Sequence, residues 1–133
     1  MIYFLDTDIC IYFLRGDIPG LADVFRAQRP DQIKIPAIVA AELFLGGHKS
    51  RDPAKTQKAI AAFLEPFEII PFDLSAAETY AQIRENLETQ GNIIGPNDLL
   101  IAATALSRKG TLITRNLKEF SRVPLLKIQD WII

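Results

Sequence analysis

The sequence predicts a three-layer α/β fold, in which a short, mostly parallel sheet of four or five strands carries helices on both faces. Short apolar segments rich in β-branched and aromatic residues recur along the chain, and segments with helical periodicity separate them. Strands and helices that alternate in this way are typical of a parallel sheet buried on both faces. The composition, 49% hydrophobic in 133 residues, is sufficient for one core, so we expect residues 1–133 to form a single domain.

The first half of the chain predicts two strands and four helices. The strands are expected at residues 1–5 and 33–35, and the helices at 7–15, 20–28, 37–47 and 53–64. Thr7 and Asp8 are suitable residues to cap the first helix, and Gly16 is suitable for its end. The helix from residue 37 is apolar on nearly all sides, which predicts that it is buried.

The second half of the chain predicts three further strands and three helices. The strands are expected at residues 67–72, 111–114 and 125–128, and the helices at 76–90, 98–109 and 116–120. Ser75 and Glu78 have the spacing of a capping box at the start of the longest helix, which Gly91 ends. Asn97 follows a loop and is expected to cap the next helix.

Several classes of protein are excluded by composition. No apolar segment approaches the roughly 20 residues of a membrane-spanning helix, and the N-terminus lacks the features of a signal peptide, so we expect a cytoplasmic protein that binds no membrane. Cys10, the only cysteine, lies in an apolar segment and is expected in the core, so neither a disulfide nor a cysteine-based metal site is available. The single histidine, His48, makes a Ser-His-Asp or Cys-His arrangement untenable.

The charge of the chain excludes a general electrostatic attraction for nucleic acid. Its net charge is −1 and its pI about 5.8, so any polyanion must be bound locally. The basic residues gather in two clusters, each of which is explained most simply as a solvated helix face: Arg108, Lys109, Arg115, Lys118 and Arg122, and His48, Lys49, Arg51, Lys55 and Lys58.

Three acidic residues are candidates for a functional site. Asp6 directly follows the first strand, and in parallel α/β sheets ligands bind at the carboxyl ends of the strands. Glu42 is the only charged residue between Lys34 and Lys49, in a helix expected to be buried, where a lone carboxylate is costly. Asp98 opens a helix.

Each of these acids also has an ordinary structural explanation. Asp6 can start a turn, Glu42 can form an ion pair, and Asp98 can interact with the positive end of the helix dipole. One divalent cation would account for all three, because Mg²⁺ takes oxygen ligands and retains several waters. Such an ion can activate a water for in-line attack on a phosphodiester.

Four segments that span the whole chain form a recognisable series: MIYFLDTD at the start, AAELFLGG around Glu42, IGPNDLLIAATAL around Asp98, and LITRNLKEFSRVP followed by IQDW. They resemble the successive motifs of PIN-domain endoribonucleases, and most closely those of the VapC-type toxins of toxin–antitoxin pairs. The resemblance implies a PIN-like fold and an endoribonuclease that hydrolyses RNA, often transfer RNA. It also implies an antitoxin partner and a homodimer built on the N-terminal helices.

The resemblance further implies roles for individual residues. Asp6 and Asp98 would ligate Mg²⁺ or Mn²⁺, and Glu42 would complete the acidic pocket. Many PIN domains carry a fourth acid where this chain has Asn116. Glu119 lies three residues further, on the same helix face, and is a candidate for that fourth role together with Asn116.

Arg115 and Lys118 are the candidates for binding the RNA phosphates. They lie in the segment after the fourth strand, which should run beside the end of the first strand and therefore beside Asp6.

Two other functions are compatible with part of the sequence. FLDTDIC resembles the first motif of haloacid-dehalogenase-type phosphohydrolases, in which Asp6 would be the nucleophile and Asp8 the acid, but no acidic pair follows the fourth strand. A catalytically inactive PIN-like module that only binds RNA or protein is the second alternative, and its one argument is Asn116.

Overall fold

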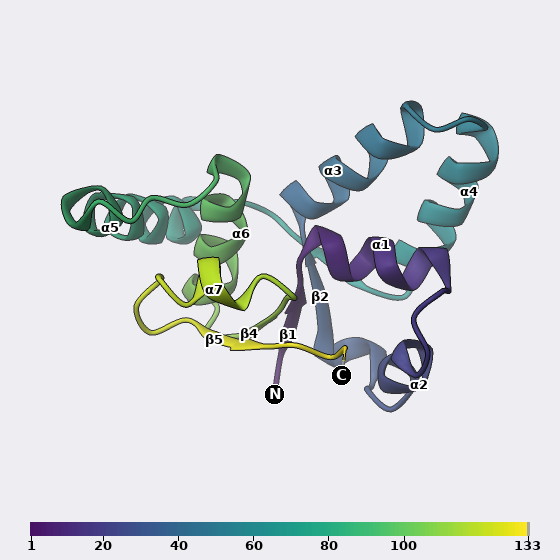
Figure 1. Cartoon of the computed structure of the whole chain (residues 1–133), viewed down its shortest axis with the longest axis horizontal. Coiled ribbons are helices and arrows are strands. Elements are labelled where there is room, and N and C mark those ends of the chain that lie inside the picture. The colour runs from purple at the N-terminus through teal and green to yellow at the C-terminus, as the bar shows by residue number, and fades with distance from the viewer. Residues whose placement is uncertain (133) are drawn as a thin grey trace.

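The computed structural model describes residues 1–132, and its centre is one five-stranded sheet (Figure 1). The strand order is β3-β2-β1-β4-β5, and every neighbouring pair is parallel. The strands are β1 (Tyr3–Leu5), β2 (Ile33–Pro36), β3 (Glu68–Ile70), β4 (Thr111–Ile113) and β5 (Lys127–Gln129). The predicted α/β fold with a parallel sheet is therefore confirmed.

The helices connect these strands and surround the sheet. They are α1 (Thr7–Arg15), α2 (Leu21–Arg26), α3 (Ala37–His48), α4 (Pro53–Leu64), α5 (Leu74–Gln90), α6 (Pro96–Ser107) and α7 (Leu117–Phe120). Figure 1 shows α3 and α4 as a hairpin that projects on one side of the molecule, whereas α5 and α6 lie on the other side. None of the helices among residues 1–132 has the length and apolar character needed to cross a membrane.

The core is built on the two central strands. Leu5 of β1 and Leu112 and Ile113 of β4 are fully buried, as expected for strands covered on both faces. The central helix α6 adds a nearly continuous buried surface, since Leu99 and residues 101–105 are buried. Cys10 is buried, which confirms its prediction as a core residue.

Two long helices begin at residues other than those expected. The N-cap of α5 is Asp73, whose Oδ1 accepts a hydrogen bond from the Ala76 amide at 2.9 Å, so the prediction that Ser75 caps this helix was wrong. Gly95 occupies the N-cap position of α6, and Asn97 lies inside the first turn. In both cases a proline or acid nearby offered a competing start, and local spacing alone could not choose between them.

The prediction that α3 is buried was correct for only part of the helix. Val39 and Leu43 are buried, but Phe44 and Leu45 are 41% and 54% exposed. The reason is that α3 projects from the sheet and packs mainly on α4 and α1, so part of its apolar surface has no neighbour. The hairpin is held where the Gln57 amide donates to the Phe44 carbonyl at 3.0 Å.

The carboxyl ends of β1 and β4 lie side by side. Leu5 is paired with Ile113, and the amide of Asp6 donates to the Ile113 carbonyl at 3.1 Å. The amide of Thr114 donates to the Gln129 carbonyl at 2.9 Å, which extends the pairing towards β5. Asp6 and Thr114 therefore leave the sheet at the same edge, where sequence reasoning expected them.

Candidate active site

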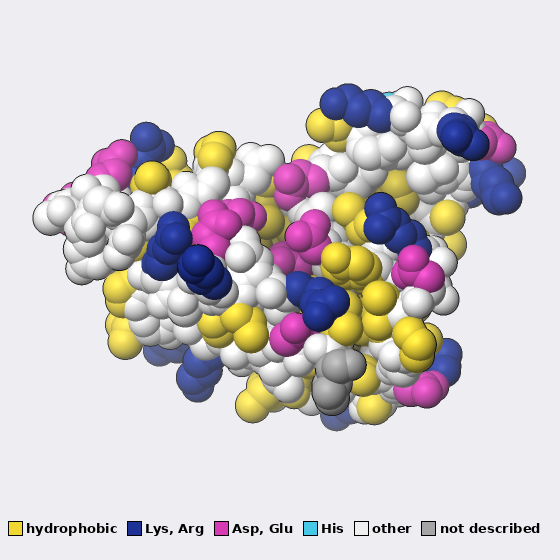
Figure 2. Space-filling model, viewed as in Figure 1, with side chains coloured by type: hydrophobic (Ala, Val, Ile, Leu, Met, Phe, Trp, Pro, Cys, Tyr) yellow, Lys and Arg dark blue, Asp and Glu magenta, His cyan; other side chains and the backbone are white. Residues whose placement is uncertain are grey.

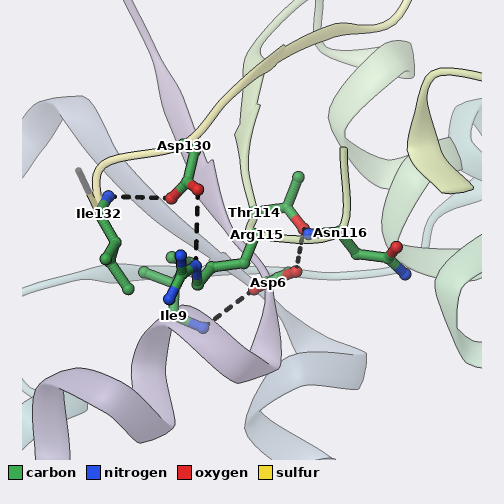
Figure 3. Close-up of polar contacts among 7 residues, drawn as sticks. All are labelled: Asp6, Ile9, Thr114, Arg115, Asn116, Asp130 and Ile132. Atoms are coloured by element: carbon green, nitrogen blue, oxygen red, sulfur yellow. Dashed lines mark hydrogen bonds and ion pairs between the residues drawn. The ribbon is translucent and has the colours of Figure 1, made fainter. Parts of the chain in front are cut away.

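Asp6 is buried at the junction of β1 and α1, with 5% of its surface exposed. Its Oδ1 accepts a hydrogen bond from the Ile9 amide at 3.0 Å, so Asp6 itself is the N-cap of α1, in place of the expected Thr7 or Asp8. Its Oδ2 accepts a hydrogen bond from the Thr114 hydroxyl at 2.5 Å (Figure 3). Both oxygens are thus oriented by groups at the carboxyl edge of the sheet.

The environment of Asp6 favours the protonated carboxyl. Burial is the largest influence and raises its pKa from 3.8 to about 6, although the hydrogen bonds from Thr114 and Ile9 lower it. The negative charges of Asp8 and Glu42 act in the same direction as burial. A positive ion beside Asp6 would reverse this balance.

Glu42 lies on α3 and is held by side chains from two other helices. Its Oε1 accepts a hydrogen bond from the Thr7 hydroxyl of α1 at 2.5 Å, and its Oε2 accepts one from the Asn97 amide of α6 at 3.2 Å. Glu42 therefore connects α1, α3 and α6 at a point where they meet. The ion pair that offered an ordinary explanation for Glu42 is not formed with any of residues 1–132.

Asp98 is in the first turn of α6 and is half-buried. Burial is the largest cause that raises its pKa from 3.8 to about 6, and the charges of Glu119, Asp6, Glu42 and Asp8 add to it in that order. Asp98 and Asp6 therefore repel each other although 92 residues separate them (98 − 6).

These carboxylates line one open cavity of about 420 Å³. Figure 2 shows acidic side chains (magenta) gathered where α1, α3 and α6 converge in Figure 1. The cavity is lined by Asp6, Thr7, Asp8, Ile11, Glu42, Leu45, Gly46, Lys49, Asn97 and Asp98. The three acids singled out in the sequence thus share one cavity, and Asp8 is a fourth.

Asn116 and Glu119 are not among the lining residues of this cavity, although the charge of Glu119 acts on Asp98, which is one of them. The Asn116 amide donates to Glu119 Oε2 at 2.7 Å, and the backbone amide of Gly95 donates to Glu119 Oε1 at 2.9 Å. These hydrogen bonds, that of Gly95 foremost, lower the pKa of Glu119. Glu119 thereby ties the start of α6, and with it Asp98, to the segment after β4.

Arg115 and Lys118, the candidates for RNA binding, are also outside the lining of the cavity. The Arg115 Nε lies 3.5 Å from Asp130 Oδ2 (Figure 3). The Arg115 guanidinium also lies over the Tyr12 ring, 5.9 Å from the ring centre. Arg115 directly follows Thr114, the hydrogen-bond partner of Asp6, but its charge is partly neutralised by Asp130.

The donor atoms of the cavity fit a hard divalent cation. Within residues 1–132, no group of three or more Asp, Glu, His or Cys side chains is close enough together to coordinate a metal ion by itself. An open site with two or three carboxylates and several waters is nevertheless what Mg²⁺ prefers. Asp6, Glu42 and Asp98 also have no ion pair with any described residue that would compensate their charge.

Sequence reasoning missed the polar residues that hold Glu42. Thr7 and Asn97 were explained as helix caps, and neither is one. Their positions in the sequence were the available signal, because Thr7 directly follows Asp6 and Asn97 directly precedes Asp98. Lys49 was assigned to a solvated basic cluster, whereas it lines the acidic cavity.

A parallel sheet with an acidic cavity at the carboxyl ends of its strands is the arrangement of an α/β protein that binds a ligand there. The PIN domain family matches residues 3–126, and the chain belongs to this family. Its relatives include ribonuclease VapC2 of Rickettsia felis, 39% identical with 98% of both chains covered. The tRNA(fMet)-specific endonuclease VapC of Salmonella typhimurium is 33% identical with 97% of both covered.

Solved structures agree with this assignment. A structure of VapBC2 from Rickettsia felis bound to a DNA fragment from its promoter contains a chain with a TM-score of 0.93 and 39% identity, with 98% of this chain and 99% of that one covered. DNA-bound VapBC from Salmonella typhimurium gives a TM-score of 0.93 at 32% identity, with 98% of each covered. The resemblance to VapC-type PIN domains is confirmed, and the haloacid-dehalogenase alternative is wrong.

Proposed function

We propose that the protein is a divalent-metal-dependent endoribonuclease that hydrolyses RNA phosphodiester bonds at the cavity formed by Asp6, Glu42 and Asp98. One observation carries the proposal. Three carboxylates from distant parts of the chain converge on one open cavity, and no ion pair with residues 1–132 compensates them. The ribonuclease activity named for the relatives supports the same reaction.

The residues of the chain supply binding and orientation. Dependence on a divalent metal is general for PIN-domain VapC nucleases, and Asp6 and Asp98 are the residues that would hold Mg²⁺ or Mn²⁺ here, with Glu42 completing the pocket. When bound, the ion supplies activation of the attacking water and compensation of charge on the phosphate. Thr114 fixes Asp6, and Glu119 with Asn116 fixes the helix start that carries Asp98.

RNA positioning is assigned to cationic side chains around the cavity. We retain Arg115 and Lys118 for this role, because Arg115 directly follows Thr114, the hydrogen-bond partner of Asp6. A phosphate that approaches Arg115 competes with Asp130 for its guanidinium, so the contact would be formed only with substrate present.

The relatives also suggest a cellular role and partners. VapBC structures are complexes of toxin and antitoxin, which supports a cognate antitoxin for this chain and a role as the toxin of such a pair. One relative is named as specific for tRNA(fMet), which supports transfer RNA as substrate and a cytoplasmic location. We further propose that residues 1–133 are one nuclease domain, since one hydrophobic cluster joins all the layers of the fold. The homodimer stays a proposal that the family resemblance implies.

The test is cleavage of RNA by the wild type and two matched variants. Wild type should cleave RNA with Mg²⁺ or Mn²⁺ and lose activity in EDTA, whereas Asp98→Asn should be inactive in either metal. Asp17→Asn, an identical change in an exposed loop, should cleave as the wild type does. Cleavage that persists in EDTA would refute the dependence on a divalent metal. RNA binding without cleavage under all conditions would favour the inactive binding module.

A further inference from the structure

A second cavity of about 590 Å³ continues from the acidic one between α1, α3 and α4. The two cavities have Ile11, Glu42 and Gly46 in common as lining residues. The floor of the second cavity is apolar, formed by side chains that include Leu43 and Ile60. We call this second cavity the α1–α4 groove. It gives the acidic cavity an extension along the projecting hairpin of Figure 1.

The charge of the lining reverses between the two cavities. Four carboxylates and one cation, Lys49, line the first. Apart from the common Glu42, the α1–α4 groove is lined by three cations, Arg15, Arg51 and Lys55, and by one acid, Asp52. Asp52 is the N-cap of α4 and accepts a hydrogen bond from the Lys55 amide at 3.2 Å.

Arg15 and Arg51 differ from every other arginine in residues 1–132. Arg122 donates a hydrogen bond to the Ile93 carbonyl, and the remaining five, Arg26, Arg29, Arg84, Arg108 and Arg115, lie within ion-pair distance of a carboxylate. Arg15 and Arg51 have neither kind of partner among the described residues, and both are exposed at the groove. Their guanidinium groups are therefore free to bind an external anion without breaking an existing contact.

We propose that the α1–α4 groove binds the sugar–phosphate backbone of the RNA strand next to the cleaved bond, through Arg15 and Arg51 with Lys55. This inference rests on the proposed nuclease function, since the cleaved phosphate has to lie in the acidic cavity. From Glu42 to His48, α3 rises about 9 Å. An RNA strand that runs along α3 can therefore place the cleaved phosphate at the acids and its neighbouring phosphates at the basic side of the groove. Arginine binds phosphate oxygens in a bidentate manner.

The groove also predicts what kind of recognition takes place. Its lining residues include no aromatic side chain on which a base could stack. Contacts with phosphates position a strand but carry no sequence information. The groove should therefore increase affinity for RNA of any sequence, and substrate selectivity has to come from other residues.

The test compares two double variants of the full chain in an Asp98→Asn background, which we expect to bind RNA without cutting it. Arg15→Ala with Arg51→Ala removes the two free arginines. Arg26→Ala with Arg29→Ala removes two arginines on and after α2 that already have acidic partners. Binding of a fluorescent single-stranded RNA is measured by anisotropy over a KCl series.

The groove variant should bind roughly tenfold more weakly, with a salt slope lower by about 1.4, because each phosphate contact on a single strand contributes about 0.7. The control variant should retain the slope. Arg15→Lys with Arg51→Lys should recover most of the slope, since the charge is kept. In the active background the groove variant should raise KM for RNA and leave kcat and the metal requirement unchanged.

An unchanged affinity and slope in the groove variant would overturn the proposal, as would failure of the Asp98→Asn chain to bind RNA. A fall in kcat at unchanged affinity would also overturn it. If RNA binding is unaffected but a complex with the protein partner is lost, the groove serves that partner and not RNA. Groove-dependent binding by a wild-type chain that never cleaves RNA would refute the nuclease function, and with it the placement of the groove next to a cleaved bond, but would uphold Arg15 and Arg51 as phosphate contacts.

Discussion

Asp6 and Glu42 line the same cavity, but the fold holds them in different ways. Asp6 is buried at the end of the central strand and is fixed by a backbone amide and by Thr114 of the neighbouring strand. Glu42 is half-buried on a projecting hairpin and is fixed only by two side chains, those of Thr7 and Asn97. The position of Asp6 is thus part of the sheet, whereas that of Glu42 depends on how α3 packs against α1 and α6.

The largest effects are expected at Asp6, where catalysis and folding coincide. Asp6→Asn and Asp6→Ala should both reduce cleavage on the order of a hundredfold or more. Asp6→Ala should in addition be about 1 to 3 kcal/mol less stable than Asp6→Asn, because it removes the cap of α1 and leaves the buried Thr114 hydroxyl without its acceptor. Urea unfolding and single-turnover cleavage measure the two effects. Equal stability of the two variants would show that Asp6 is not held as described.

At Glu42 we expect a loss of activity without a comparable loss of stability. Glu42→Gln should abolish cleavage, and Glu42→Ala should cost no more than about 1 to 2 kcal/mol of unfolding free energy, since the carboxylate is held by two side-chain hydrogen bonds and by no ion pair with a described residue. Thermal unfolding and RNA cleavage are measured on the same preparations. A Glu42→Gln variant that cleaves at the wild-type rate but has a much lower melting temperature would show that Glu42 stabilises the fold and is not needed for cleavage.

The pH dependence of stability distinguishes a carboxylate kept for a cation from one that stabilises the fold. Folding raises the pKa of Asp98 from 3.8 to about 6, so the folded chain binds the proton more tightly than the unfolded chain does. The resulting contribution to the free energy of unfolding is fully present below pH 3.8 and is lost as pH rises through about 6. Between pH 4 and 7.5 in EDTA, wild type should therefore lose about 1 kcal/mol relative to Asp98→Asn, a figure discounted for partial exposure. Mg²⁺ should restore wild type alone. A wild type that gains stability relative to the variant as pH rises would contradict the raised pKa.

The smallest effects are expected at the side chains that hold Glu42. Asn97→Ala should lower kcat by a few-fold, roughly three to ten times, and change the unfolding free energy by less than about 0.5 kcal/mol, because Asn97 is exposed. Thr7→Val should act in the same way, and Thr7→Ser should retain activity because it keeps the hydroxyl. Steady-state cleavage over a metal titration reports both. If Thr7→Ser is as slow as Thr7→Val, the hydroxyl is not what positions Glu42.

The sheet and the edge that carries the site were predictable because they follow from local pattern and one topological rule. Apolar strands that end at Asp6 and Thr114, joined by helices, place both residues at the carboxyl edge of a parallel sheet. The helix starts were less predictable, since Asp73 and Ser75 are both good caps and only the final backbone conformation selects one.

The partners of Glu42 could not be predicted, for a different physical reason. The sequence separations are 35 residues to Thr7 and 55 to Asn97, so these hydrogen bonds depend on how three helices pack and not on any local spacing. The exposure of Phe44 and Leu45 has the same origin, because an apolar helix is buried only as far as its neighbours extend. The roles of the site residues themselves stay predictions until the variants are measured.

The hydrogen bond between Thr114 and Asp6 joins residues 108 positions apart. During synthesis the chain emerges from its N-terminus, so Asp6 and the first turn of α1 are available long before β4 exists to pair with β1. A contact of such long sequence separation requires a long loop to close, which costs conformational entropy and slows folding. The oriented Asp6 carboxylate is therefore completed only after β4 has left the ribosome, and a truncated product that lacks β4 cannot assemble it.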